Sequence, residues 1–297
     1  MKKTIHKPYP ENSGTIIAFT GGDIAAHRDT LIRMNAPAIK LSYFGLTQRK
    51  TDIEQLKEDL NYFEYVILDP GMGSVRGLHK KYGSSFKPEY YIEKYYDFCY
   101  SIREHVTFIM AYDMLSDNFG YDDIREFTYL GLTYGLNIAP TIHAIPQRKL
   151  FDAGYLDDFD IVNIMTNDKN WAHTTDVFDK IAKRGIKIHG HAVTNMQKYQ
   201  YLPFYSTDTS AWLDGQKFGT TYKYVNNKIM TYNVRDKAMI RRSLFPIAVE
   251  YGIDTDLIEA DINGSFGNDV MGEVNALNLI AWLQFASARR EANYARR

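Results

Sequence analysis

Cysteine is almost missing from this sequence of 297 residues, which contains Cys99 and no second thiol. One cysteine cannot form an internal disulfide, and it cannot build a zinc site from several thiolates. The helical pattern and the tyrosines around Cys99 predict a small buried apolar side chain rather than a nucleophile. A chain without disulfides is expected in a reducing compartment, which favours the cytoplasm.

Long apolar runs and an excess of charge are missing as well. No run approaches the roughly 18 apolar residues of a membrane-spanning helix. The lysines in the opening MKKTIHKPYPENSG are not followed by the apolar segment of a secretory signal, so we expect no membrane partner. The 35 basic and 36 acidic residues give a net charge of −1, which indicates no attraction to nucleic acid by the whole surface but allows a local basic patch.

Eight short apolar runs alternate with segments of helical periodicity. Each run is continuous rather than alternating in polarity, as expected for parallel strands buried on both faces. The runs are TIIAF (15–19), AIKLSYF (38–44), YVILD (65–69), VTFIMAYD (106–113), IAPTIHA (138–144), IVNIM (161–165), IKIHGHA (186–192) and PFYSTD (203–208). This alternation predicts an α/β fold of the TIM (β/α)8 barrel type. The alternative is an open doubly wound sheet, although the glycine pair at 21–22 is not the G-x-G-x-x-G pattern typical of such folds.

Helices are predicted at 24–35, 52–63, 88–104, 121–135, 147–156, 171–184 and 195–201. Beyond residue 220 the stretch TTYKYVNNKIMTY predicts a hairpin, and two helices are expected near 235–251 and 268–290. The apolar stripe of the last helix predicts packing either on the barrel or against another copy in a homo-oligomer. We therefore expect an N-terminal segment (1–13) and one barrel domain (14–297) with a helical C-terminal extension.

Acids and histidines stand where several predicted strands end. Asp69, Asp113 and Asp208 each close a strand, and the remaining candidates are His143, His189 and His191. In a TIM barrel these strand ends meet at the catalytic face. Two carboxylates can divide the work at an anomeric carbon, one as nucleophile and one for proton transfer. A third, if ionised and dry, can accept two hydrogens from a guanine-like base.

Three of these segments resemble motifs of the tRNA-guanine transglycosylases. The stretch from Asp208 to Gly219 resembles the nucleophile motif, in which an aspartate ending strand eight is followed eleven residues later by glycine. ILDPGMG resembles the family's D-S-G-G-F motif, and MAYDM resembles the strand whose aspartate reads the base. The run IKIHGHAVTNMQKYQYLPFYSTDTSAWLDGQKFG is similar to compact transglycosylase-like proteins of bacteriophages, relatives of the enzymes that insert 7-deazaguanines into DNA.

The resemblance implies exchange of guanine for a 7-deazaguanine such as preQ0 or preQ1 in a nucleic acid, with DNA favoured over tRNA. We expect no cofactor and no metal. Asp208 would form a covalent aspartyl-glycosyl intermediate, Asp69 would be the acid/base, and Asp113 would read the base together with His143. The remaining residues expected to contact substrate are His189, His191, Ser210, Lys217 and Gly219. Ser210 begins the Ser-Ala-Trp-Leu stretch that stands in place of the family's Thr-Arg pair, for which Lys217 can partly compensate. The family's cysteine-rich zinc subdomain is absent.

Two other functions fit the same residues. His143, His189 and His191 with Asp208 can form the metal site of an amidohydrolase-like barrel, although the H-x-H pair of that family usually lies on the first strand and here lies on the seventh. A catalytically inactive barrel that binds nucleic acid or another protein is the second alternative.

Overall fold

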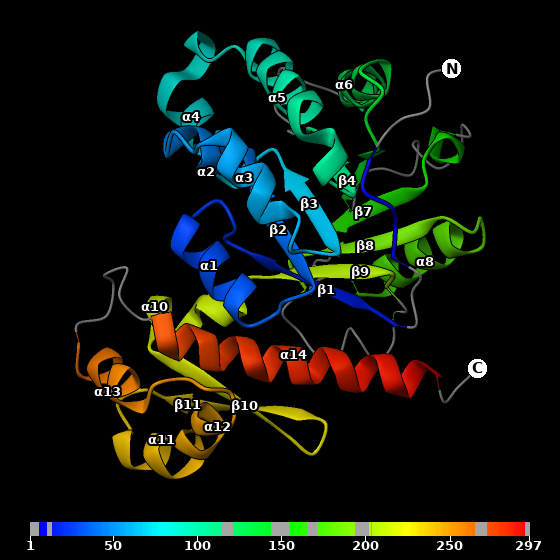
Figure 1. Cartoon of the computed structure of the whole chain (residues 1–297). Coiled ribbons are helices and arrows are strands. Elements are labelled where there is room, and N and C mark those ends of the chain that lie inside the picture. The colour runs from blue at the N-terminus through cyan, green and yellow to red at the C-terminus, as the bar shows by residue number, and fades with distance from the viewer. Residues whose placement is uncertain are drawn as a thin grey trace.

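The computed structural model is described for residues 6–10, 14–113, 121–143, 155–165, 171–193, 202, 204–264 and 272–294. Its centre is a ring of parallel strands surrounded by helices (Figure 1). The ring strands are β1 (Ile16–Thr20), β2 (Ala38–Ser42), β3 (Tyr65–Asp69), β4 (Phe108–Met110), β5 (Ile138–Ala139), β6 (Thr141–His143), β7 (Ile161–Met165), β8 (Lys187–His191) and β9 (Ser206–Thr209). The helices around them are α1 (Ala25–Arg33), α2 (Tyr43–Gln48), α3 (Ile53–Leu60), α4 (Met72–Tyr82), α5 (Pro88–Ile102), α6 (Tyr121–Thr133) and α8 (Trp171–Ala182).

The sheet closes on itself. Its strands pair in the order β5-β4-β3-β2-β1-β9-β8-β7-β6, and the pairings are parallel. The two ends of this order, β5 and β6, are consecutive pieces of the single strand predicted at 138–144. Pro140 separates them because it has no N–H to give to the ladder, while its carbonyl still accepts from the N–H of Asn163 at 2.9 Å. The fold is therefore the predicted TIM barrel and not an open doubly wound sheet.

Alternate residues of the strands point into the barrel and fill it. Ile16, Tyr65 and Phe108 belong to a buried cluster made of the first and middle inward positions. Residues 6–10 reach this end of the barrel, where Tyr9 packs against the cluster and its hydroxyl accepts from the side chain of Asn137 at 2.8 Å. The N-terminal part of the barrel is thus a packed core, which leaves chemistry to the carboxyl ends of the strands.

Five of the predicted helices are confirmed by α1, α3, α5, α6 and α8. The prediction at 195–201 falls outside the described residues, and of 147–156 the structure describes the 3-10 turn η3 (Tyr155–Asp158). Two helices around the barrel, α2 and α4, were missed. The strand predicted at 38–44 ends at Ser42, whose hydroxyl accepts from the N–H of Gly45 at 3.3 Å and so begins α2. α4 follows directly on Pro70 and Gly71, in a stretch for which no helix was predicted.

The chain after β9 adds a compact set of elements beside the barrel. They are the 3-10 turn η5 (Ala211–Leu213), α10 (Asp214–Phe218), β10 (Thr220–Val225), β11 (Lys228–Asn233), α11 (Lys237–Ser243), α12 (Phe245–Glu250), α13 (Thr255–Asn263) and α14 (Gly272–Tyr294). The predicted hairpin is confirmed, and it turns at Asn226 and Asn227, whose φ angles of 50° and 63° suit a tight turn. The helix predicted at 235–251 is instead two helices, because Pro246 starts a new first turn. α13 was not predicted.

α14 has two buried faces. Leu279, Trp282 and Phe285 join the core that lies between the barrel and its helices. Val274 and Ile280 join a second cluster with α11, α12 and α13. α14 therefore packs on the barrel, the first of its two expected positions, and links it to the C-terminal elements (Figure 1).

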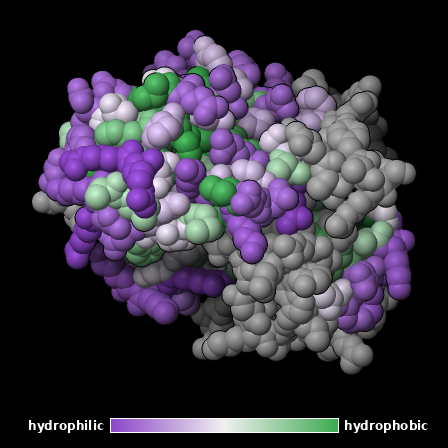
Figure 2. Space-filling view, turned by 90° about the horizontal axis from the view of Figure 1, so that it is seen from below, coloured by the Kyte–Doolittle hydropathy of each residue, from purple (hydrophilic) through white to green (hydrophobic). Residues whose placement is uncertain are grey.

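The outer surface of the described part has no extended apolar face in view. On the side below the barrel in Figure 1, hydrophobic residues lie in small patches among hydrophilic ones (Figure 2). Exposed apolar side chains such as Val249 and Leu257, at 69% and 51% exposure, are ordinary for a protein surface when they stand singly. None of the helices in the described part combines the length and apolar character needed to cross a membrane.

Candidate active site

Polar side chains take over the inward positions near the carboxyl ends of the strands. Along a strand, each lies an even number of residues from the positions that point inward. Its side chain therefore also points into the barrel. The set comprises Lys40 on β2, Asp69 on β3, His189 and His191 on β8, and Ser206 and Asp208 on β9. Their levels agree because β8 and β9 pair His189 with Ser206, and β1 and β9 pair Ala18 with Asp208.

Lys40 lies between two of the predicted catalytic carboxylates. Its ammonium nitrogen is 3.0 Å from Oδ2 of Asp69 and 3.2 Å from Oδ2 of Asp208. β1 separates the strands of Lys40 and Asp208, and its inward residue paired with Asp208 is Ala18, whereas Thr20 pairs with Lys40. The small methyl group leaves room for the lysine side chain to cross β1. The two carboxylate oxygens are consequently at most about 6 Å apart.

The ion pairs decide the charge state of this cluster. Burial alone would raise the pKa of Asp69 and of Asp208, but the Lys40 ammonium, His191 and the hydrogen bonds to the two carboxylates together outweigh burial and lower the pKa of both, that of Asp208 most strongly. Burial would likewise lower the pKa of Lys40, and the two carboxylates outweigh it and raise that pKa. All three groups are therefore charged at neutral pH, although Lys40 and Asp208 are buried and the Asp69 side chain is only 14% exposed.

The two oxygens of Asp208 have different surroundings. Oδ1 accepts from the backbone N–H of Ala192 at 3.1 Å and from Nε2 of His189 at 3.1 Å, whereas Oδ2 faces Lys40. Nδ1 of His191 lies 3.3 Å from Oδ1 and 3.1 Å from the Lys40 nitrogen, so it donates to the first or accepts from the second according to its tautomer. Oδ1 is thus anchored, and Oδ2 is the oxygen that becomes available when Lys40 moves.

A hydrogen-bonded chain fixes the tautomer of His189. Its Nδ1 is 2.8 Å from the Ser206 hydroxyl, which is 2.7 Å from the hydroxyl of Tyr65. Burial lowers the pKa of His189 to about 4 and raises that of Tyr65 well above its usual value, so both side chains are neutral. Tyr65 then donates to Ser206, Ser206 donates to Nδ1, and the Nε2–H of His189 donates to Asp208.

The turn after β3 shapes the edge of the site. Gly71 has a φ of 85°, and a Cβ added there would lie 2.5 Å from the Cβ of Phe44 and 2.8 Å from the Ser42 hydroxyl oxygen. Its N–H donates to Oδ1 of Asp69 at 2.5 Å. A glycine is therefore required both by the backbone conformation and by the close approach of β2, and it holds Asp69 in place.

A pocket of about 240 Å³ opens at this end of the barrel. Asp69, Asp113 and His191 line it together with Asn163 and the beginning of α4. This volume is below the roughly 300–1,000 Å³ of pockets for drug-sized ligands, so it suits a small group such as one base. Asp69 and Asp113 thus face one pocket, as the sequence predicted.

The other predicted site residues have different positions. Asp208 and His189, at 2% and 0% exposure, are not among the described residues that line the pocket, and neither is Lys40; Asp208 contacts the lining residue His191. Ser210, Lys217 and Gly219 follow β9 and are not among the described residues that line the pocket. Gly219, with a φ of 62°, ends α10 as its C-terminal cap, and Lys217 is exposed on that helix. His143 ends β6, and its side chain lies outside the described part of the chain.

Lys40, Ser206 and Tyr65 were missed by the sequence prediction. Lys40 had a signal, because a lysine in the otherwise apolar run AIKLSYF is in phase with Ala38, which points inward. A charge at an inward position of a strand that is buried on both faces requires a partner. Ser206 and Tyr65 had none, because their roles depend on the pairing of distant strands.

Comparison with known proteins assigns no family to the chain. No protein-family model matches the chain, and no curated protein does. Similar solved structures include the tryptophan synthase alpha-subunit from the hyperthermophile Pyrococcus furiosus, at 12% identity and a TM-score of 0.45, covering 70% of this chain and 92% of that one. Another is tryptophan synthase from M. tuberculosis, at 9% identity and a TM-score of 0.44, covering 69% and 86%. The barrel assignment follows from the closed strand order itself.

Proposed function

We propose that this barrel is a glycosyl-transferring enzyme that exchanges guanine in a nucleic acid for a 7-deazaguanine. The observation that carries the proposal is the Asp69–Lys40–Asp208 cluster, in which one ammonium holds two ionised carboxylates beside a base-sized pocket. Carboxylates about 5–5.5 Å apart are typical of enzymes that form a covalent glycosyl intermediate, and the spacing here, at most about 6 Å, is compatible with that. The resemblance of the three strand-end segments to transglycosylase motifs agrees with this chemistry.

In the first half of the proposed reaction, Oδ2 of Asp208 attacks C1′ of a guanosine. A C–O bond forms while the bond from C1′ to N9 of the guanine breaks, and the departing base takes a proton. Lys40 supplies that proton through Asp69, with which it is hydrogen-bonded. Loss of its charge weakens its hold on Asp208 and releases Oδ2.

In the second half, N9 of the incoming 7-deazaguanine attacks C1′ and the bond to Asp208 breaks. Asp69 accepts the N9 proton and returns it to Lys40, so the cluster ends as it began. Asp113 lines the pocket on the side of β4 and accepts hydrogens from the base edge. In duplex DNA the guanosine has to leave the base stack before it can enter.

The test is exchange of labelled guanine into DNA and into tRNA, with wild type and Asp208→Asn compared. Asn is isosteric but a poor nucleophile, so we expect a loss on the order of 10³-fold or more. Asp160→Asn is the matched control, because this exposed aspartate stands just before β7, at the opposite end of the barrel. Undiminished exchange in Asp208→Asn would refute the role of Asp208 as nucleophile. No exchange by folded wild type would favour a barrel that binds without catalysis.

A metal-dependent hydrolase is the second candidate. Ligand atoms of His189, His191 and Asp208 lie within 4.8 Å of one another, close enough to hold a metal ion. The ammonium of Lys40 touches two of these residues and already compensates the Asp208 charge, which weakens the site for a second cation. Stoichiometric metal in purified wild type that is lost in a His189→Ala/His191→Ala variant would favour this candidate.

A further inference from the structure

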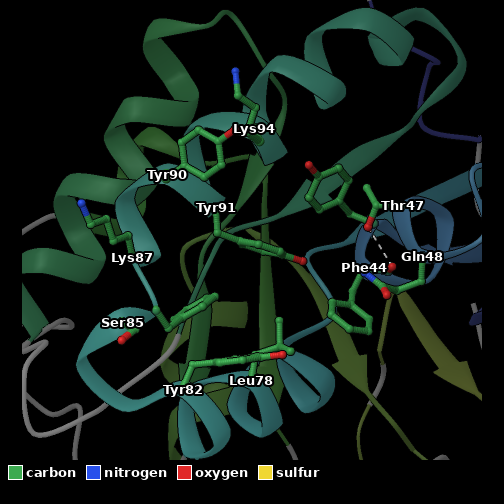
Figure 3. Close-up of a pocket in the computed structure, with 12 residues that line it drawn as sticks. Phe44, Thr47, Gln48, Leu78, Tyr82, Ser85, Lys87, Tyr90, Tyr91 and Lys94 are labelled. Carbon is green, nitrogen blue, oxygen red and sulfur yellow. Dashed lines mark hydrogen bonds between the residues drawn. The ribbon is translucent and has the colours of Figure 1, made fainter.

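A second pocket, of about 530 Å³, lies outside the barrel between α2, α4 and α5. Aromatic side chains dominate its walls. In Figure 3, Tyr91 and Tyr82 lie on opposite sides of the pocket, with Leu78 beside Tyr82 and Phe44 on the flank. Tyr82 and Tyr90 are 51% and 62% exposed, which is unusual for tyrosines whose task is packing. The Lys81 ammonium lies 5.1 Å from the centre of the Tyr82 ring, an exposed contact that a planar group can replace.

The rim of this aromatic pocket is basic. Lys87 and Lys94 line it, and no aspartate or glutamate is among its described lining residues. Figure 3 shows both amino groups pointing away from the centre of the pocket. Lys94 also lies 3.3 Å from Asp97 and 5.6 Å from the centre of the Tyr90 ring, two weak and exposed interactions that a phosphate can replace. Aromatic faces with lysines at the edge are typical of sites for single-stranded nucleic acid.

The aromatic pocket is connected to the candidate active site through α4 and the turn before it. The hydroxyl of Tyr91 donates to the carbonyl of Pro70 at 2.5 Å, directly after Asp69. α4 connects the two pockets, because Met72 at its start lines the first and Leu78 and Tyr82 line the second. At 1.5 Å per helical residue, Leu78 is about 9 Å and Tyr82 about 15 Å along the axis from Met72. A neighbouring nucleotide of the same strand can span that distance.

We infer that the aromatic pocket binds an unpaired nucleotide next to the reacting guanosine. This inference rests on the proposed function, because the smaller pocket has room for one base and the adjoining strand needs a place outside it. The base of the neighbour stacks between Tyr82 and Tyr91, and Lys87 and Lys94 contact its phosphates. Holding the neighbour unstacked also keeps the reacting guanosine out of the base stack.

The test uses a single-stranded DNA oligonucleotide with one guanine and 2-aminopurine beside it, whose fluorescence is quenched by stacking. The variant is Tyr82→Ala/Tyr90→Ala, chosen because both side chains are exposed and the fold should tolerate their loss. Tyr62→Ala/Tyr100→Ala is the matched control, with exposures of 70% and 49% outside the pocket. We expect the pocket variant to bind roughly 5- to 150-fold more weakly and to lose the quenching, and the control to bind as wild type does.

Unchanged binding by the pocket variant, or no binding by wild type, overturns the inference. The inference is also overturned if wild type is a dimer in analytical ultracentrifugation and the pocket variant is a monomer, because the pocket would then bind a second copy of the chain. Base exchange separates this inference from the proposed function. If wild type quenches the fluorescence but does not exchange bases, the pocket inference stands and the proposed function is refuted. If the pocket variant exchanges bases with an unchanged KM, the proposed function stands and the pocket inference is refuted.

Discussion

Replacing Lys40 by methionine tests the cluster on which the candidate site depends. The substitution keeps the length of the side chain and removes the charge that compensates Asp69 and Asp208. Breaking a buried ion pair from one side costs about 3–5 kcal/mol. The remaining carboxylates can instead share a proton, and neutralising one aspartate at pH 7 costs about 4 kcal/mol, given its usual pKa of about 3.9. The two routes agree, and either is a large part of a typical stability of 5–15 kcal/mol.

The pH dependence distinguishes this electrostatic loss from a packing defect. In Lys40→Met the buried carboxylates have a folded pKa above the unfolded value, so the variant is most stable below about pH 4 and loses stability as the pH rises through the raised pKa. The difference from wild type should therefore fall from about 4 kcal/mol at pH 7 to about 1.5 kcal/mol at pH 5. Urea unfolding at both pH values measures it.

Lys180→Met is the control for that experiment. Lys180 pairs with Asp176 at 2.8 Å on the exposed face of α8, where both side chains are about half exposed. An exposed pair of this kind contributes about 0.3–0.5 kcal/mol. A loss in Lys40→Met that is no larger than in the control, or that is equal at pH 5 and pH 7, would refute the buried cluster.

Three further predictions concern the same end of the barrel. Gly71→Ala should lower both exchange activity and the urea midpoint, because the new methyl group meets Phe44 and forces a positive φ on a residue with a Cβ. Ala18→Leu should separate Lys40 from Asp208 and abolish exchange, with intact circular dichroism as the check on folding. The folded pKa of His189 is lowered to about 4 from 6.5, so its stability contribution is present above pH 6.5 and lost as the pH falls toward 4. His189→Gln should remove up to about 3 kcal/mol of that pH dependence, measured by unfolding between pH 4 and 7.

The fold was largely predictable because its main signal is local. A continuous apolar run followed by a helical segment is visible in any short window, and eight such units leave few topologies. Helix boundaries were less predictable where a strand and a helix share one apolar run, as at Ser42, or where glycines open a helix, as in α4. Pro246 and Asp254 were the local signals for the division of the C-terminal helices.

The acidic residues of the candidate site were predictable from the sequence, whereas the ion pairs that they form were not. Asp69, Asp113 and Asp208 lie at or near the carboxyl ends of their strands, and the barrel alone brings them to one face. The separation of their roles depends on which strand pairs with which: Asp69 and Asp113 line the pocket, whereas Asp208 is reached through Lys40. No spacing along the chain encodes that Ala18 lets a lysine from β2 reach an aspartate on β9.

Lys40 also explains how such a site can rest without a substrate. Two carboxylates and one ammonium carry a net charge of −1, whereas without the ammonium the two carboxylates would carry −2 at a cost of several kcal/mol. Under the proposed reaction that net charge does not change. When the proton of Lys40 leaves with the guanine, positive charge develops at C1′ between the same carboxylates, and when Asp208 forms the ester, Asp69 alone remains charged. An ammonium can give up its proton, so the cation at C1′ can replace it. A metal ion held by His189, His191 and Asp208 would keep its charge.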